Sequence, residues 1–148
     1  KPPFLLEYLE GLPVEYRFYR DKAHQKQILN EQLRKVSAEN LPFNEMVIIS
    51  PNKFENSCVK SITDYSIKEI KTASEFSGTQ KNVGFATVHS YKGMESNHVL
   101  ITDIEDLSSE VAKSLMYVGM SRARYGLILL ISESMQNQYN EILKNKFS

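Results

Sequence analysis

The sequence contains one cysteine, no tryptophan and no long apolar run. The single cysteine, Cys58, excludes an internal disulfide and a multi-cysteine zinc site, and it fits a reducing compartment. The three histidines, at positions 24, 89 and 98, are too scattered to predict a metal site. The longest apolar run, 127–131, is far shorter than the roughly 20 residues that cross a membrane, and no signal peptide opens the chain. We therefore expect a soluble, cytoplasmic protein with no metal site on this chain and no membrane partner.

An excess of positive charge is also missing. Eighteen Lys and Arg residues balance 18 Asp and Glu residues, so the formal net charge is zero. Nucleic-acid-binding proteins usually carry a basic excess, so any nucleic-acid contact here must be local. A phosphate-binding loop of the form G-x-x-x-x-G-K-S/T is absent from the sequence, so this chain lacks the groups that cradle nucleotide phosphates and hold magnesium. The length of 148 residues fits one domain.

Strand and helix patterns alternate along the chain, which predicts parallel βαβ units rather than a bundle or a sandwich. Six short segments have strand character: residues 14–19, 46–50, 67–70, 84–88, 98–101 and 127–131. Helices are expected from the capping residue Asp21 to about position 40, over 54–62, from position 108 or 109 onward, and around 135–143. Residues 72–82 have the composition of a loop.

The helix that starts at position 108 or 109 is expected to bury one face, formed by Val111, Leu115 and Val118. Arg122 lies one turn beyond Val118 on the same side. Arg124 would point about 200° away from Arg122 around the helix, so we expect it to be a solvated or interdomain charge.

Two short motifs stand out in the second half of the chain. The first, at 87–95, reads TVHSYKGME, and the second, at 116–124, reads MYVGMSRAR. In that order they resemble the fifth and sixth motifs of superfamily-one helicases of the UvrD/Rep type, whose usual forms are T-I/V-H-x-x-K-G-L/M-E and L-x-Y-V-A/G-x-S/T-R-A. The resemblance implies an α/β fold: a three-layer RecA-like (P-loop NTPase-like) domain with a mainly parallel sheet.

This resemblance implies that ATP and Mg are held by an N-terminal RecA-like domain outside this chain and that ATP is contacted from this side. Arg122 matches the sixth-motif arginine that contacts the γ-phosphate, and it is the catalytic candidate. A guanidinium from a second domain can stabilise the charge on the transferred phosphoryl group, and its planar fork can bind two oxygens. Glu95 matches a glutamate that contacts the ribose, and Gly93 allows close backbone approach. The ordinary alternatives are an arginine at a helix C-terminus, an exposed glutamate and a turn glycine.

The resemblance also places Thr87 and His89 on the path of single-stranded DNA, with Lys92 facing DNA or the interdomain cleft. Hydroxyls, Lys side chains and backbone amides commonly contact phosphates, which position nucleic acid without reading its sequence. His89 taken alone is more typical of a structural histidine. Tyr91 could stack on a base or could be a core tyrosine. We expect ligands to bind at the carboxyl ends of the strands, as in open α/β sheets.

We interpret the chain as one RecA-like domain over residues 1–148, the second motor domain of an ATP-dependent DNA helicase or translocase. Its expected partners are single-stranded DNA and the N-terminal domain, and the isolated domain is expected to be inactive. The stretch between Ser50 and Gly84 is too short for the large accessory domain that such helicases insert there. The alternative is a non-motor binding or regulatory module that keeps the helicase fold, for example in a defence or repair complex.

Overall fold

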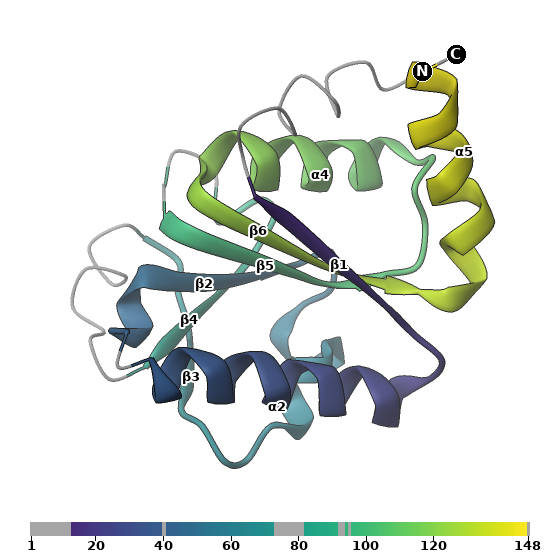
Figure 1. Cartoon of the computed structure of the whole chain (residues 1–148). Coiled ribbons are helices and arrows are strands. Elements are labelled where there is room, and N and C mark those ends of the chain that lie inside the picture. Colours follow the sequence, from purple (N-terminus) through teal and green to yellow (C-terminus); the bar gives the residue numbers. More distant parts are fainter. Residues whose placement is uncertain (1–12, 40, 73–81, 92–93, 95, 148) are drawn as a thin grey trace.

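The chain forms three layers, with a twisted sheet between helices (Figure 1). This computed structural model describes residues 13–39, 41–72, 82–91, 94 and 96–147, without the side chains of residues 44, 139, 142, 143 and 145–147. The fold class is α/β with a RecA-like three-layer arrangement, as predicted. Across the described ranges, no helix combines the length and apolarity that a membrane span requires.

The sheet has six strands in the order β1-β6-β5-β2-β4-β3, and each strand pair is parallel. The strands are β1 (Val14–Tyr19), β2 (Met46–Ser50), β3 (Ile67–Glu69), β4 (Val83–Thr87), β5 (Ser96–Ile104) and β6 (Ala123–Ser132). All six predicted strands are present, although β5 and β6 are longer than expected. Because the strands are parallel, their amino ends form one edge of the sheet and their carboxyl ends form the other.

Two long helices cover opposite faces of the sheet (Figure 1). Helix α2 (Lys22–Ala38) begins at Asp21, whose Oδ1 accepts a hydrogen bond from the backbone N–H of His24 at 2.8 Å. Helix α4 (Glu110–Arg122) begins at Ser109, whose hydroxyl accepts from the backbone N–H of Ala112 at 3.1 Å. Both are standard N-caps, and both were predicted. Helix α5 (Gln136–Phe147) closes the chain.

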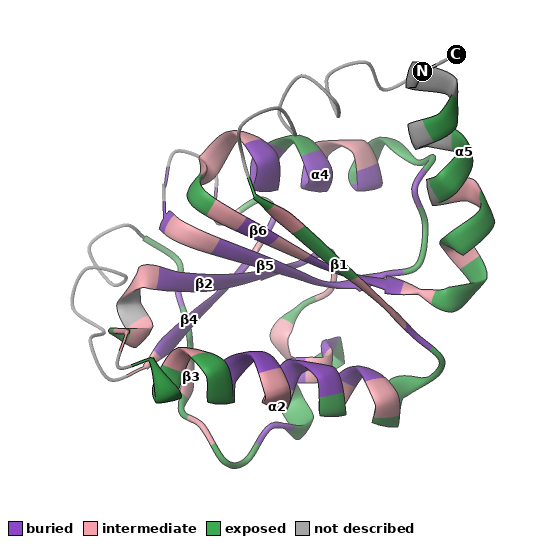
Figure 2. Ribbon diagram, viewed as in Figure 1, coloured by how far each residue is buried: buried purple, intermediate pink, exposed green. Residues whose placement is uncertain are grey.

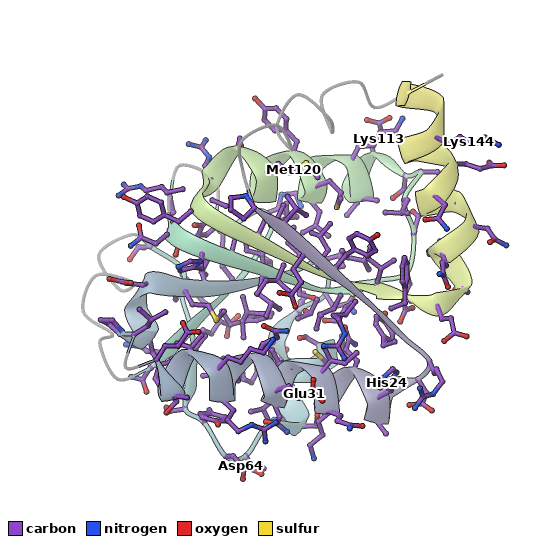
Figure 3. The ribbon with its side chains drawn as sticks, viewed as in Figure 1. His24, Glu31, Asp64, Lys113, Met120 and Lys144 are labelled. Atoms are coloured by element: carbon purple, nitrogen blue, oxygen red, sulfur yellow. The ribbon has the colours of Figure 1, made fainter. Side chains whose placement is uncertain are left out.

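Each face of the sheet has its own apolar core (Figure 2). Successive β2 residues point to opposite faces, so Ile48 packs toward α2 while Val47 and Ile49 pack toward α4. Figure 3 shows the two helical layers through their labelled residues, with Glu31 on α2 and Met120 on α4. The burial of β2 on both faces explains its continuous apolar sequence.

The predicted helix over 54–62 is wrong. The segment instead forms two 3-10 turns, η2 (Phe54–Asn56) and η3 (Cys58–Ser61). The backbone N–H of Cys58 donates to the carboxylate of Asp103, and that of Val59 donates to the Ser57 hydroxyl at 3.1 Å. These two donors are therefore unavailable to an α-helical ladder, because side chains have taken them.

The predicted buried face of α4 is correct for Leu115 and Val118 and wrong for Val111, which is 52% exposed. Ala112, Met116 and Gly119 are buried as well. A Cβ atom placed on Gly119 would lie 2.4 Å from Cδ1 of Ile101 in β5. Because position 119 has no side chain, this face of the helix can lie close to Ile101.

Candidate nucleotide and nucleic-acid sites

The predicted site residues lie at two opposite edges of the sheet. Helix α4 runs antiparallel to the strands, so its last residue, Arg122, lies where β6 begins. Ala123 pairs with Ser96, the first residue of β5, at this amino edge. Thr87 ends β4 and pairs with Ser50, the last residue of β2, at the carboxyl edge. The expectation that both sites lie at the carboxyl ends is therefore wrong for Arg122, because the α4 crossover returns the chain to the amino edge.

Arg122 is partly buried, and its Nε has no hydrogen-bond partner among the described residues. A buried guanidinium N–H without an acceptor is costly, so the Nε of Arg122 is a donor that still needs a partner. Arg122 is also the basic residue of the last turn of α4, which is the ordinary alternative from the sequence. A helix C-terminus explains a positive charge there but does not explain the unpaired Nε.

The candidates Gly93 and Glu95 lie outside the described residues. Ser96, the residue that follows them, is 4% exposed. Its hydroxyl lies 3.0 Å from the backbone carbonyl of Glu45 and 3.2 Å from that of His98, both acceptors. A hydrogen bond therefore connects the start of β5 to the segment before β2. Ser96 also pairs with Ala123, the residue that follows Arg122.

Thr87 starts a tight turn at the carboxyl edge. Its carbonyl accepts from the backbone N–H of Tyr91 at 3.0 Å, and its hydroxyl accepts from the backbone N–H of Ser90 at 3.3 Å. The hydroxyl also donates to that of Ser90 at 3.2 Å. The turn holds the exposed His89 away from the core. Lys92, the third DNA candidate, lies outside the described residues.

Tyr91 belongs to the core on the α4 side of the sheet and is 0% exposed. Its ring therefore cannot stack on a base without leaving the core, and the core interpretation of this residue is correct. Arg124 is exposed, as expected, but it belongs to β6 rather than to the helix. The angle predicted between the two arginines does not apply, because α4 ends at Arg122.

A buried carboxylate, Asp103, joins four segments near the carboxyl edge. Its Oδ1 accepts from the Gln25 amide at 3.1 Å and from the backbone N–H of Cys58 at 3.2 Å. Its Oδ2 accepts from the hydroxyls of Thr102 at 2.7 Å and Ser50 at 2.9 Å. The backbone N–H of Asp103 donates to the Gln25 side chain at 2.7 Å. The charge is thus compensated by hydrogen bonds, as a buried carboxylate requires.

A β-bulge brings Asp103 into this position. Ile101 pairs with Leu129, but Ile104 pairs with Ile131, so β5 has one residue more than β6 between the two pairs. Asp103 has a φ of 60°, the left-handed conformation that such bulges often contain. Ile101 and Ile104 consequently face the same core, while Asp103 turns toward Gln25 of α2.

Two hollows open above Asp103 at the carboxyl edge. The larger, about 480 Å³, lies between the start of α2 and the η2–η3 segment, and its lining includes Lys22, Asn52 and Lys60. The smaller, about 280 Å³, lies toward the start of α4 and shares Asn52 and Glu105 with the first. Sequence reasoning missed this region, although an aspartate within the apolar run of β5 was a visible signal.

Burial near Asp103 also changes two neighbouring groups. Burial raises the pKa of the Cys58 thiol, and the negative charge of Asp103 adds to the effect. Burial likewise raises the pKa of the Tyr19 hydroxyl, together with the nearby charges of Glu105 and Asp103. Both groups are protonated at neutral pH, so Cys58 is a poor nucleophile. Within the described part of the chain, no group of three or more His, Cys, Asp or Glu residues could hold a metal ion.

Comparison with known proteins shows a likeness in fold. No model of a known protein family matches the sequence, and no curated protein matches it. Among solved structures, the fold is similar to that of the C-terminal domain of a possible DNA helicase from Lactobacillus plantarum WCFS1, with a TM-score of 0.64 and 17% sequence identity. The match covers 86% of this chain and 83% of that chain. At this identity the likeness shows the fold alone: the chain shares the fold of that domain.

Proposed function

We propose that this chain is the second motor domain of an ATP-dependent DNA helicase or translocase of the UvrD/Rep type. The observation that carries the proposal is Arg122, a partly buried arginine with an unpaired Nε, at the amino edge of the sheet and inside the second motif. The order of the two motifs and the likeness to a possible helicase domain support the same function. Residues 1–148 form a single RecA-like domain in this proposal.

In this function the two edges of the sheet have different tasks. Arg122, at the amino edge, donates to phosphate oxygens of the nucleotide. Glu95 contacts the ribose, and Gly93 allows the backbone to approach the nucleotide closely. The unpaired Nε of Arg122 fits a phosphate acceptor, since an arginine fork binds phosphate well. ATP, with its Mg on the companion N-terminal domain, supplies the phosphoryl group whose transfer drives the motor.

Thr87 and His89, at the carboxyl edge, bind the backbone of single-stranded DNA together with Lys92. The exposed His89 and the Thr87 hydroxyl at the start of the turn support this assignment, because side chains of these kinds can contact phosphates. Closure of the two motor domains on ATP would move the DNA-binding residues along the strand, since both sites belong to one rigid sheet. Hydrolysis would then release it.

Replacement of Arg122 tests the proposal. In the full-length protein, Arg122→Ala should lower the ATPase rate by about 10²–10⁵-fold without unfolding the domain, because the guanidinium acts mainly in the transition state. Arg122→Lys should not restore the rate, because lysine lacks the planar fork. The measurement is steady-state phosphate release, with the fold checked by circular dichroism.

Arg124→Ala is the matched control. It removes the same charge two residues away, from an exposed position in β6, and should retain most of the activity. The isolated 148-residue chain should release no phosphate, since it lacks the phosphate loop. Wild-type turnover in Arg122→Ala would exclude the proposed role and favour the non-motor binding module.

A further inference from the structure

A single carboxylate holds the segment that follows β2. The Ser50 hydroxyl donates to Asp103 Oδ2 at 2.9 Å and accepts from the backbone N–H of Asn52 at 3.0 Å. Further along, the backbone N–H of Cys58 donates to Asp103 Oδ1 at 3.2 Å. The beginning and the middle of residues 51–61 are therefore both connected to Asp103.

This segment lies beside the turn that begins at Thr87. Ser50 and Thr87 are paired at the ends of adjacent parallel strands, so the chain leaves both strands at the same place. The Phe54 ring packs edge-on against Phe85 of β4, with ring centroids 5.3 Å apart. The segment and the turn thus begin side by side at the carboxyl edge, so the position of the segment affects the shape of that edge.

The segment carries side chains that suit a nucleic-acid backbone. Lys53 and Lys60 are exposed, and Asn52 and Lys60 line the 480 Å³ hollow. Lysine and asparagine side chains commonly donate to phosphate and sugar oxygens. Because the chain has no net charge, such local donors matter more here than a general basic field.

An aspartate at position 103 is energetically unfavourable for two reasons, its burial and its backbone conformation. The side chain is only 7% exposed, and its φ of 60° would suit glycine better. A residue kept in such a conformation indicates that its side chain does something that glycine cannot do. Here the side chain supplies acceptors to Ser50 and to the backbone of Cys58.

We propose that Asp103 is a positioning residue for nucleic-acid binding: through Ser50 and the Cys58 amide it holds residues 51–61 beside the Thr87 turn, so that both face the bound strand. This proposal rests on the proposed function. Asp103 itself does not touch the strand in this arrangement, because its carboxylate is buried and fully used by the four donor groups. Its contribution is to keep the binding surface in one conformation before the strand arrives.

Asp103→Gly tests this role without backbone strain, because glycine accepts the left-handed conformation and removes only the carboxylate. The hydrogen-exchange rate of the Cys58 amide shows whether residues 51–61 stay in place. Fluorescence anisotropy with a labelled oligothymidylate measures the affinity for the strand. If the segment occupies its bound position only about a tenth of the time in this variant, affinity falls about tenfold. The Cys58 amide should lose its protection in the same variant.

Three further variants sharpen the experiment. Asp103→Asn should restore binding, because asparagine tolerates the same φ, its oxygen can accept from Cys58 and its amide can donate to the Ser50 hydroxyl. Ser50→Ala removes the hydroxyl that joins Asp103 to the backbone of Asn52 and leaves the Cys58 link in place, and it should weaken binding even if Asp103→Gly does not fold. Asp106→Asn is the matched control, because this exposed carboxylate at the same edge bonds to Ser108 and Ser109 rather than to residues 51–61.

The outcomes separate the two proposals. Weakened binding in Asp103→Gly and Ser50→Ala, with restored binding in Asp103→Asn, supports the positioning role. Wild-type affinity in both Asp103→Gly and Ser50→Ala overturns the positioning role while the proposed function stands. An unchanged hydrogen-exchange rate of the Cys58 amide in Asp103→Gly has the same consequence. A wild-type chain that binds no oligothymidylate overturns nucleic-acid binding at this edge and the positioning role with it, whereas the Arg122 experiment still decides the ATP-side role.

Discussion

Three aspartates near the carboxyl edge each organise a different segment. Asp21 is the N-cap of α2, and Asp103 holds the segment after β2 from a buried position. Asp106 is exposed and accepts from the backbone and hydroxyl of Ser108 and from the backbone of Ser109. The same side chain therefore acts as a cap, as a buried anchor or as the organiser of an exposed turn, depending on which donors the backbone presents.

The Asp106 carboxyl should titrate below the usual range of an aspartate. Hydrogen bonds from Ser109 and Ser108 lower the pKa of the Asp106 carboxyl from 3.8 to about 2. The pKa is depressed in the folded protein, so the stabilisation is complete above about pH 4 and is lost as the pH falls toward 2. Carboxyl chemical shifts measured by NMR should show this midpoint.

The exposure of Asp106 limits the effect on stability, because solvent screens its interactions. Asp106→Asn should remove the titration near pH 2 and leave that of the other exposed carboxyls unchanged. A midpoint near 3.8 for Asp106 in the folded chain would show that the turn between β5 and α4 is not ordered by this side chain.

Helix α4 is held to the sheet by an unusually close contact. A Cβ on Gly119 would lie 2.4 Å from Cδ1 and 3.3 Å from Cγ1 of Ile101, which is 0% exposed. The contact sets the height and rotation of the helix, and with them the place where Arg122 meets the edge of the sheet. The element therefore connects core packing to the proposed nucleotide site.

Gly119→Ala should destabilise the domain although alanine favours helices by about 1 kcal/mol over glycine. The added methyl overpacks the contact with Ile101, which typically costs about 1–3 kcal/mol. Ile101→Val removes the Cδ1 atom in question and should itself cost about 0.5–1.5 kcal/mol. Urea denaturation of the two single variants and the double variant measures the coupling.

The double variant should lose less free energy of unfolding than the two single variants lose together, and the difference should be at least about 0.5 kcal/mol. Purely additive effects would mean that the Gly119 contact relaxes elsewhere. Val111→Ala, at an exposed position on the same helix, is the control and should change the free energy of unfolding little.

At the scale of the whole molecule, the sheet separates the two proposed sites. Strand β5 has 9 residues, so it spans about 30 Å between the edges. Contacts at one edge can therefore influence the other through the rigid sheet or through movement of the whole domain. A small domain with no net charge offers no long-range field to gather nucleic acid at either edge.

Nucleic-acid binding by the chain should accordingly be weak, independent of sequence and only moderately sensitive to salt. With two or three phosphates neutralised, the slope of log affinity against log salt should be about −1.5 to −2, since each single-strand contact contributes about −0.7. Anisotropy titrations at several salt concentrations give the slope, and alanine at Lys92 should reduce it. A slope several times steeper would mean a larger binding surface than the carboxyl edge of this domain provides.

The sequence by itself determined the order and the type of most elements. Alternating and continuous apolar runs predicted the six strands. Asp21 marked the start of one long helix, and Ser108 or Ser109 that of the other, because these signals are local. The motifs placed Arg122 at the end of a helix, which is also a local property. The α/β fold with a parallel sheet followed from the alternation of elements.

Only the tertiary structure decided which residues meet. The separation of Arg122 from Thr87 depends on the α4 crossover, which carries the chain back to the amino edge. The loss of the predicted helix over 54–62 depends on Asp103, a residue more than forty positions away that takes the Cys58 amide. The close approach of Gly119 to the sheet depends on Ile101, and the burial of Tyr91 depends on its core neighbours. Such contacts leave no periodic signal, because they arise between segments that are distant along the chain and meet only when the sheet is complete.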